Sequence, residues 1–216
     1  MPLAFSRATG PALAAALALL LLAGPLGLGA CLSLNSPRMP SLANAVVSSD
    51  FESYAVRRVG LLPFTGRNLT PAQGVDLQHA FHTELAQSTP FEIVLLAASD
   101  QAELESSDPY RRGWYKPKTI IGLSQRYSLD AVLFGTVTQE RFFPPQLLSL
   151  QTDLVSAETG LVLWSGNVNL DAADPRVLEG LQVYYGNEDD DQSWRVALLS
   201  PERFARFAAF QIASLL

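Results

Sequence analysis

The two histidines of this 216-residue chain, His79 and His82, are the side chains best suited to bind a metal ion. Glu84 follows them as a nearby carboxylate. On a helix that turns about 100° per residue, both imidazoles point away from the apolar face around Phe81, whereas Glu84 lies close to that face. Because the carboxylate cannot readily join them as a third ligand, we predict a surface pair of histidines, with a zinc site as the alternative.

Motifs of nucleophilic and phosphate chemistry are missing from the sequence. Residues 122–126, Gly-Leu-Ser-Gln-Arg, match the Gly-x-Ser-x-Gly nucleophile elbow except at the last position. No phosphate-binding glycine-rich loop follows a predicted strand. We therefore predict that the protein is not an enzyme and that it needs no cofactor.

An acidic run near the carboxyl terminus offers oxygen ligands without a metal-binding pattern. It consists of Glu188, Asp189, Asp190 and Asp191. The run lacks the Asp-x-Asp-x-Asp-Gly spacing with which an EF-hand binds Ca²⁺. It predicts a solvated acidic loop, and a partner-binding strip is the alternative.

A basic segment combines four cations with two aromatic rings inside an acidic chain. Its residues are Arg111, Arg112, Trp114, Tyr115, Lys116 and Lys118. Cations beside aromatic rings suit anionic lipid headgroups, sugars or an acidic protein surface. The alternative is that the Trp114 ring is buried and the charges are simply solvated.

Residues 142–145, Phe-Phe-Pro-Pro, leave a similar choice open. If they are exposed they form a contact patch, and if they are buried they only end a strand.

The only cysteine, Cys31, follows a leader with the three parts of a secretory signal. Arg7 supplies a positive start, residues 12–28 are apolar, and Leu-Gly-Ala occupies residues 28–30. This tetrapeptide resembles the lipobox, in which the cysteine is acylated and becomes the first residue after cleavage. We predict acylation of Cys31, with an ordinary secretory signal or an uncleaved anchor helix as alternatives. Leu32, rather than Asp, favours the outer membrane over the inner membrane.

Length and charge limit the remaining possibilities. Cleavage before Cys31 leaves 186 residues with a net charge of −7, enough for one domain with a real core. An acidic chain argues against a nucleic-acid partner. With Cys31 acylated no thiol is left for a disulfide. We predict a signal peptide at residues 1–30, a flexible tether at 31–53 and one folded domain at 54–216.

The helices that must position these side chains have clear start signals. Thr70, Pro71 and Gln73 predict the start of a helix whose Leu77, Phe81 and Leu85 are buried. Residues 117–128 predict a second helix, with Ile120, Ile121 and Tyr127 turned inward. Asp174 and Ser200 each precede a proline and open two more helices. On the last helix, Phe204, Phe207, Ala208, Ile212 and Leu215 share a buried face, and Phe210 falls outside it.

The strands alternate with the first helices and then follow one another. Residues 59–64, 91–96 and 131–137 are short apolar runs, and the third reads as a central strand. Residues 148–154 and 162–170 alternate between apolar and polar, which predicts a hairpin with one solvent-exposed face and with Trp164 in the core. We therefore predict one α/β domain with a mixed sheet and helices packed against it.

Several phrases of the sequence resemble a family of bacterial envelope lipoproteins. They are RRVGLLPF, FEIVLL, LDAVLFGTV and DLVSAETGLVLWSG, and the resemblance covers roughly residues 57–164. The shared domain is similar to the amino-terminal domain of the Tol propeller protein, which has an anticodon-binding-like fold. Relatives include the curli-secretion lipoprotein, the activators of penicillin-binding synthases and the Pel export lipoprotein. The resemblance implies assembly and oligomeric rings rather than catalysis.

Two functions of different classes are compatible with these observations. The first is a non-enzymatic adapter on the periplasmic face of the outer membrane, which binds copies of itself or an envelope machine for export, cell-wall synthesis or appendage assembly. The second is a lipid-anchored module that binds a polysaccharide or another ligand through residues 111–118.

Overall fold

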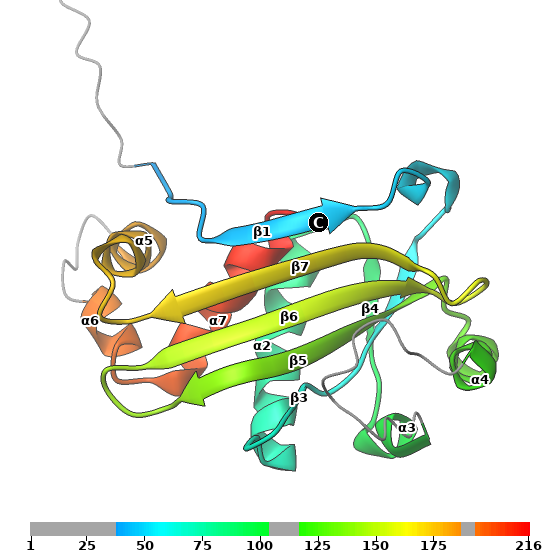
Figure 1. Ribbon diagram of the computed structural model, residues 1–216, viewed down its shortest axis with the longest axis horizontal. Helices are drawn as coiled ribbons and strands as arrows, with labels where there is room; N and C mark the ends of the chain where they lie inside the picture. The colour runs from blue at the N-terminus through cyan, green and yellow to red at the C-terminus, as the bar shows by residue number, and fades with distance from the viewer. Residues whose placement is uncertain (1–37, 104–116, 187–192) are drawn as a thin grey trace, which may run out of the picture. The chain divides into compact units, whose positions relative to one another are not determined.

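A computed structural model describes residues 38–103, 117–186 and 193–216 of the chain, and their seven strands form one sheet (Figure 1). The strand order is β1-β7-β6-β5-β2-β4, and β3 also pairs with β5. Pairing is parallel among β2, β3, β4 and β5, and antiparallel from β5 through β6 and β7 to β1. The predicted mixed sheet of an α/β domain is confirmed. The strands are β1 (Ala43–Val47), β2 (Arg58–Leu61), β3 (Thr65–Gly66), β4 (Glu92–Leu95), β5 (Ala131–Arg141), β6 (Leu147–Ser156) and β7 (Val162–Asp171).

The longer helices begin at the residues that the sequence predicts. Thr70 and Gln73 form a reciprocal capping box at the start of the first one. The side chains of Asp174 and Ser200 accept hydrogen bonds from the backbone N–H groups of Arg176 and Arg203. The helices are η1 (Phe51–Ser53), α2 (Pro71–Ser88), α3 (Ala98–Glu103), α4 (Pro117–Tyr127), α5 (Pro175–Tyr185), α6 (Ser193–Ala197) and α7 (Pro201–Ala213).

Apolar side chains are buried on both faces of the sheet. On one face, α2 and α7 pack side by side over the strands and bury Phe81 and Phe207 completely (Figure 1). On the other face, Ile120 and Leu123 of α4 pack in a smaller cluster with Val132 of β5. The prediction that Ile121 turns inward is wrong, because it is 41% exposed. Leu123 takes the inward place because it stands three residues after Ile120, on the same side of the helix.

The hairpin of β6 and β7 holds Trp164 in the core, as predicted. The side chain is 1% exposed, and its Nε1–H donates to the backbone oxygen of Leu215 at 3.1 Å. Gly160 closes the turn with a φ of 71°, a conformation that glycine adopts freely. The pairing of the strands shifts between Leu154 and Val155, and Val162 packs in the cluster on the opposite face from Trp164. The alternation predicted for residues 162–170 would place these two side chains on one face, and it is wrong here because the irregularity inverts it.

The polar side chains of β6 are buried, although the sequence predicts that they meet water. Ser149, Gln151 and Asp153 are between 7% and 8% exposed. Asp153 Oδ1 accepts hydrogen bonds from Ser165 Oγ at 2.5 Å and from Gln151 Nε2 at 3.0 Å. The prediction is wrong for β6, because its polar side chains form hydrogen bonds with one another and with side chains of β7, as buried polar groups must. On β7 it holds, since Asn167 is exposed.

The folded domain starts earlier than the predicted boundary at residue 54. Ala43 to Val47 form β1, which pairs antiparallel with β7 from Val168 to Trp164. Ala43 is 5% exposed and belongs to the core, and the Leu42 N–H donates to the Gln211 side chain at 3.0 Å. The predicted tether at 31–53 is therefore too long. Its second half gains hydrogen-bond partners only because β7 offers a free edge.

Candidate functional site

A groove lies between α2 and α7, the two helices that cover the larger core. It encloses about 600 Å³, a volume typical of ligand sites in proteins. Phe142, which follows β5, also lines it. The remaining lining side chains are Gln73, Asp76, Leu77, His79, Ala80, Thr83, Pro201, Glu202, Ala205 and Arg206.

The groove exists because small residues lie at the contact between the two helices. Ala80 of α2 and Ala205 of α7 are 4% and 5% exposed, and both belong to the core. The short side chains of Ala80 and Ala205 leave the floor of the groove open and apolar. Larger polar side chains, among them Gln73 and Thr83, form the walls.

The charged side chains on the rim of the groove that have no salt-bridge partner in the described ranges are acidic. Asp76 and Glu202 are exposed, and within the described ranges neither forms a salt bridge. Arg206 also lines the groove, but its guanidinium is paired with Glu84, at 3.1 Å from Nη2 to Oε1. The rim therefore favours a ligand with positive charge.

Glu84 is the centre of a buried polar cluster beside the groove. It is 3% exposed, and its Oε1 accepts hydrogen bonds from Tyr184 Oη at 2.7 Å and from Arg206 Nε and Nη2 at 3.3 Å and 3.1 Å. Burial, reinforced by the hydrogen bond to Glu84, raises the pKa of Tyr184 well above its ordinary value. The hydroxyl therefore stays protonated and joins α5 to α2, while Arg206 joins α7 to α2.

Neither histidine is part of a metal or catalytic arrangement within the described residues. His79 is exposed on the rim and His82 is half-buried, and Glu84 is engaged by Tyr184 and Arg206. Nowhere in the described ranges do three potential metal ligands gather. The Thr83 hydroxyl donates to the backbone oxygen of His79 at 3.0 Å, so it is not paired with the imidazole as a nucleophile would be.

An apolar patch lies at one end of the sheet. We define the end patch as Phe143, Val196 and Leu199, which are 69%, 47% and 70% exposed. Phe143 follows β5, the other two belong to α6 and the residues after it, and Gln146 Nε2 joins the two segments by donating to the Ala197 oxygen at 3.2 Å. Both alternatives for residues 142–145 therefore hold in part: Phe142 packs against the core, whereas Phe143 is exposed and available for contact.

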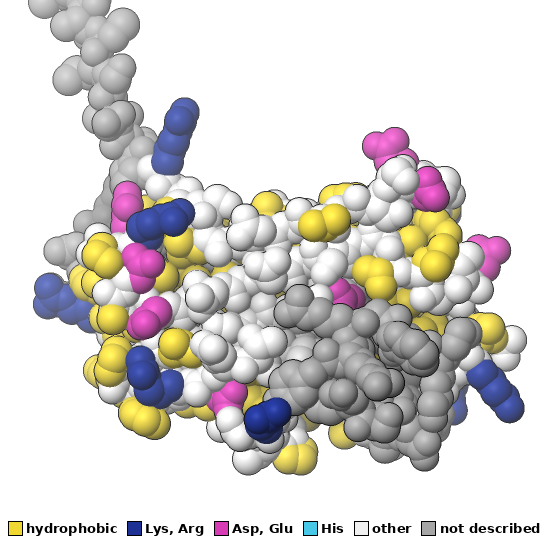
Figure 2. Space-filling model, viewed as in Figure 1, with side chains coloured by type: hydrophobic (Ala, Val, Ile, Leu, Met, Phe, Trp, Pro, Cys, Tyr) yellow, Lys and Arg dark blue, Asp and Glu magenta, His cyan; other side chains and the backbone are white. Residues whose placement is uncertain are grey.

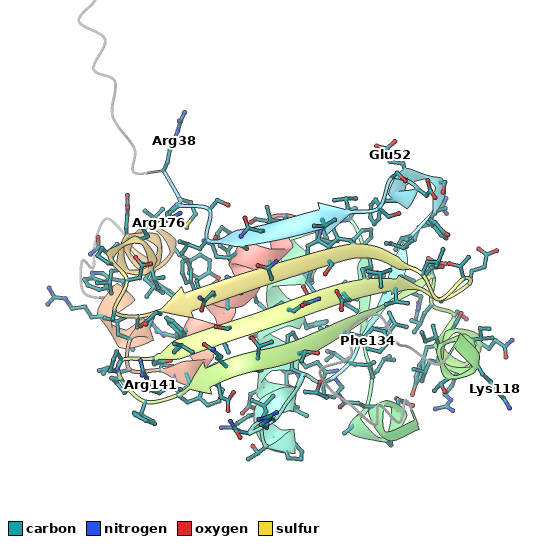
Figure 3. The ribbon with its side chains drawn as sticks, viewed as in Figure 1. Arg38, Glu52, Lys118, Phe134, Arg141 and Arg176 are labelled. Carbon is teal, nitrogen blue, oxygen red and sulfur yellow. The ribbon has the colours of Figure 1, made fainter. Side chains whose placement is uncertain are left out.

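Figure 3 places Arg38, Arg141 and Arg176 at this end of the domain and Lys118 and Glu52 at the other end. In Figure 2 the middle of the visible sheet face is mostly polar and uncharged, with one acidic side chain beside the grey residues, whereas most cationic and anionic side chains lie at its margins.

Most of the side chains predicted to bind partners lie outside the described residues. These are Cys31, Arg111, Arg112, Trp114, Tyr115, Lys116, Glu188, Asp189, Asp190 and Asp191. Lys118 is exposed at the start of α4. Phe210 lies off the buried face, as predicted, and its ring packs against Tyr184 of the same domain at 4.7 Å between centroids. Its use as a partner anchor stays a prediction.

Sequence reasoning missed the groove, and of the end patch it indicated only Phe143, as part of residues 142–145. The only signal of the groove was the pair Ala80 and Ala205, which read as ordinary helix formers. In the sequence, Glu84 stands out only as a possible third ligand of the histidines. Its position close to the apolar face of α2 was the signal of a buried carboxylate that needs partners.

No helix within the described residues is long and apolar enough to cross a bilayer.

Comparison with solved structures finds bacterial proteins of similar fold. The PelC dodecamer from Paraburkholderia phytofirmans is 12% identical, with 81% of this chain and 97% of that chain covered and a TM-score of 0.47. Lipoprotein GNA1162 from Neisseria meningitidis is 18% identical, with 53% and 79% covered and a TM-score of 0.39. The LpoB C-terminal domain from Salmonella enterica is 17% identical, with 54% and 84% covered and a TM-score of 0.36. No protein-family model and no curated protein matches the sequence. At these identities and TM-scores the comparison does not identify a function.

Proposed function

We propose that this protein is a non-enzymatic adapter of the bacterial envelope, anchored through acylated Cys31 to the periplasmic face of the outer membrane. The domain binds a segment of a partner protein in the groove between α2 and α7. The partner belongs to a machine for export, cell-wall synthesis or appendage assembly, as the sequence resemblance implies. Copies of the chain also associate with one another, through the basic segment 111–118 of one copy and the acidic run 188–191 of the next.

The groove is the observation that carries this proposal. It has an apolar floor at Ala80 and Ala205, a volume of about 600 Å³ and two open carboxylates at Asp76 and Glu202. This combination fits one or two apolar side chains with lysine or arginine beside them, which is the chemistry of a peptide segment. A catalytic role would need an activated nucleophile or a metal, and the polar groups of this groove provide neither.

The anchor is tested by replacing Cys31 with serine. We expect the wild-type chain to incorporate labelled fatty acid and to fractionate with the outer membrane. The Cys31→Ser variant should incorporate none, and should leave the membrane fraction or persist as an uncleaved precursor. A variant that is cleaved and still fractionates with the outer membrane at wild-type levels would show that the lipobox interpretation is wrong.

The groove is tested by site-specific photo-crosslinking in the living cell. A photoreactive residue at His79, which is exposed and lines the groove, should give a discrete crosslink to a partner. The matched control is Ser88, the exposed last residue of the same helix, which does not line the groove. Equal crosslinking at both positions would contradict binding in the groove.

Binding of the identified partner to the purified protein then tests its chemistry. The double substitution Asp76→Asn and Glu202→Gln removes both rim charges and keeps the side-chain volumes. We expect binding to weaken by about 3- to 10-fold, with the larger effect at low salt. The control pair Glu52→Gln and Glu158→Gln makes the same charge change at exposed positions that do not line the groove. If both pairs weaken binding equally, only the net charge matters and the groove is not the site.

A further inference from the structure

The chain enters the sheet at the end that carries the end patch. Arg141 at the end of β5 pairs with Leu147 of β6, which pairs with Asp171 of β7. Ala43, the first residue of β1, pairs with Val168 of β7, three residues before Asp171. The turn that holds Phe143 and the entry of the chain are therefore at the same end of the sheet.

The incoming chain is also fixed at this end. Arg176 of α5 donates from Nη2 to the Ser41 oxygen at 3.1 Å, and the Leu42 N–H donates to Gln211 of α7. The chain is thus held to the domain from Met39, which packs against the core, and Met39 stands only eight positions after Cys31. Fully extended, this stretch spans at most about 29 Å.

We propose that the end patch of Phe143, Val196 and Leu199 lies in the headgroup region of the bilayer to which Cys31 is attached. This inference rests on the proposed acylation of Cys31. The short connection keeps this end near the bilayer, whereas the ten residues of β6 carry the far end of the sheet about 33 Å away. Three largely exposed apolar side chains at the near end then gain contact with lipid.

The contact is apolar in character rather than electrostatic. Cations and anions both occur at this end: Arg141 ends β5 and Arg176 belongs to α5, while Asp171 ends β7 and Asp174 caps α5. Because the charges offset one another, attraction to anionic lipid contributes little. The association of the patch with lipid is therefore expected to be insensitive to salt.

The inference is tested with single-cysteine labelling of the full-length, acylated protein in vesicles of phosphatidylethanolamine and phosphatidylglycerol. Cys31 is the only cysteine of the chain and its thiol is blocked by acylation, so a new cysteine is the only free thiol. An environment-sensitive fluorophore is attached to Phe143→Cys and, separately, to Leu199→Cys. The matched control is Leu161→Cys, which is 59% exposed at the opposite end, beside the β6–β7 turn.

We expect the probes at 143 and 199 to shift to shorter wavelength and to be quenched at least twofold by lipids that carry a nitroxide, at low and at high salt. The probe at 161 should show neither effect. Vesicle flotation reports the anchor separately, so a protein that fails to float contradicts the acylation. A protein that floats with 143 and 199 no more quenched than 161 overturns the inference. Quenching that disappears at high salt also overturns it, because the contact is then electrostatic.

Discussion

The hydrogen bond from Tyr184 to the buried carboxylate of Glu84 gives a sharp test of the helix layer. The substitution Tyr184→Phe removes one hydroxyl and changes nothing else in the volume of the side chain. Glu84 is 3% exposed, and it loses the nearest of its three donors, at 2.7 Å. A hydrogen bond to a charged group contributes about 1.5–3 kcal/mol to the free energy of unfolding. Arg206 continues to neutralise the carboxylate, so we expect a loss near 2 kcal/mol.

The neighbouring residue provides the control. Tyr185 donates its hydroxyl to the backbone oxygen of Arg203 at 2.7 Å, and this acceptor is neutral. Its removal by Tyr185→Phe should therefore cost only about 0.5–1.5 kcal/mol. In a domain of this size we expect the melting temperature to fall by about 4–8 °C for Tyr184→Phe, and by roughly half of that for Tyr185→Phe.

Thermal and urea unfolding of both variants, followed by circular dichroism, check this prediction. If Tyr184→Phe is no less stable than Tyr185→Phe, the reasoning about the buried carboxylate is refuted. A fall for Tyr184→Phe of more than about 4 kcal/mol would also refute it, because Arg206 would then have failed to compensate the charge.

Three further predictions follow from the described residues and the sequence. Trp164→Ala should lower the free energy of unfolding by about 3–5 kcal/mol, and a change of only a degree or two in melting temperature would contradict burial of the ring. The wild-type protein should lose stability as the pH rises above about 10, because the unfolded Tyr184 then ionises while the folded one, with its raised pKa, stays protonated. Unfolding measured from about pH 8 to about pH 11 should show a shallower decline for Tyr184→Phe, and equal slopes would contradict the shift. Charge reversal of the basic segment should abolish self-association with little change in melting temperature, as measured by sedimentation, whereas normal assembly would exclude the segment from the contact. The reversed residues are Arg111, Arg112, Lys116 and Lys118.

Local signals in the sequence determined the helix starts and the hairpin. The side chains of Thr70 and Gln73 each accept a hydrogen bond from the other residue's backbone N–H, so the start of α2 needs no distant contact. Gly160 can adopt the positive φ of the turn because it has no side chain. The alternation of apolar and polar residues in β7 is enough to predict that Trp164 is buried. Each of these features depends on residues that are close together in the chain, and for that reason each could be predicted.

The tertiary structure decided which segments acquire partners from far along the chain. Residues 43–47 form a strand only because the edge of β7 is free, and Ala80 and Ala205 form a groove only because α2 packs against α7. Ser149 and Asp153 alternate like exposed residues, yet they are buried and form hydrogen bonds with side chains of the neighbouring strand β7. A free strand edge and a groove between helices exist only in the assembled domain. No local sequence pattern predicts them, because β1 and β7, like the two helices that line the groove, are more than a hundred positions apart along the chain.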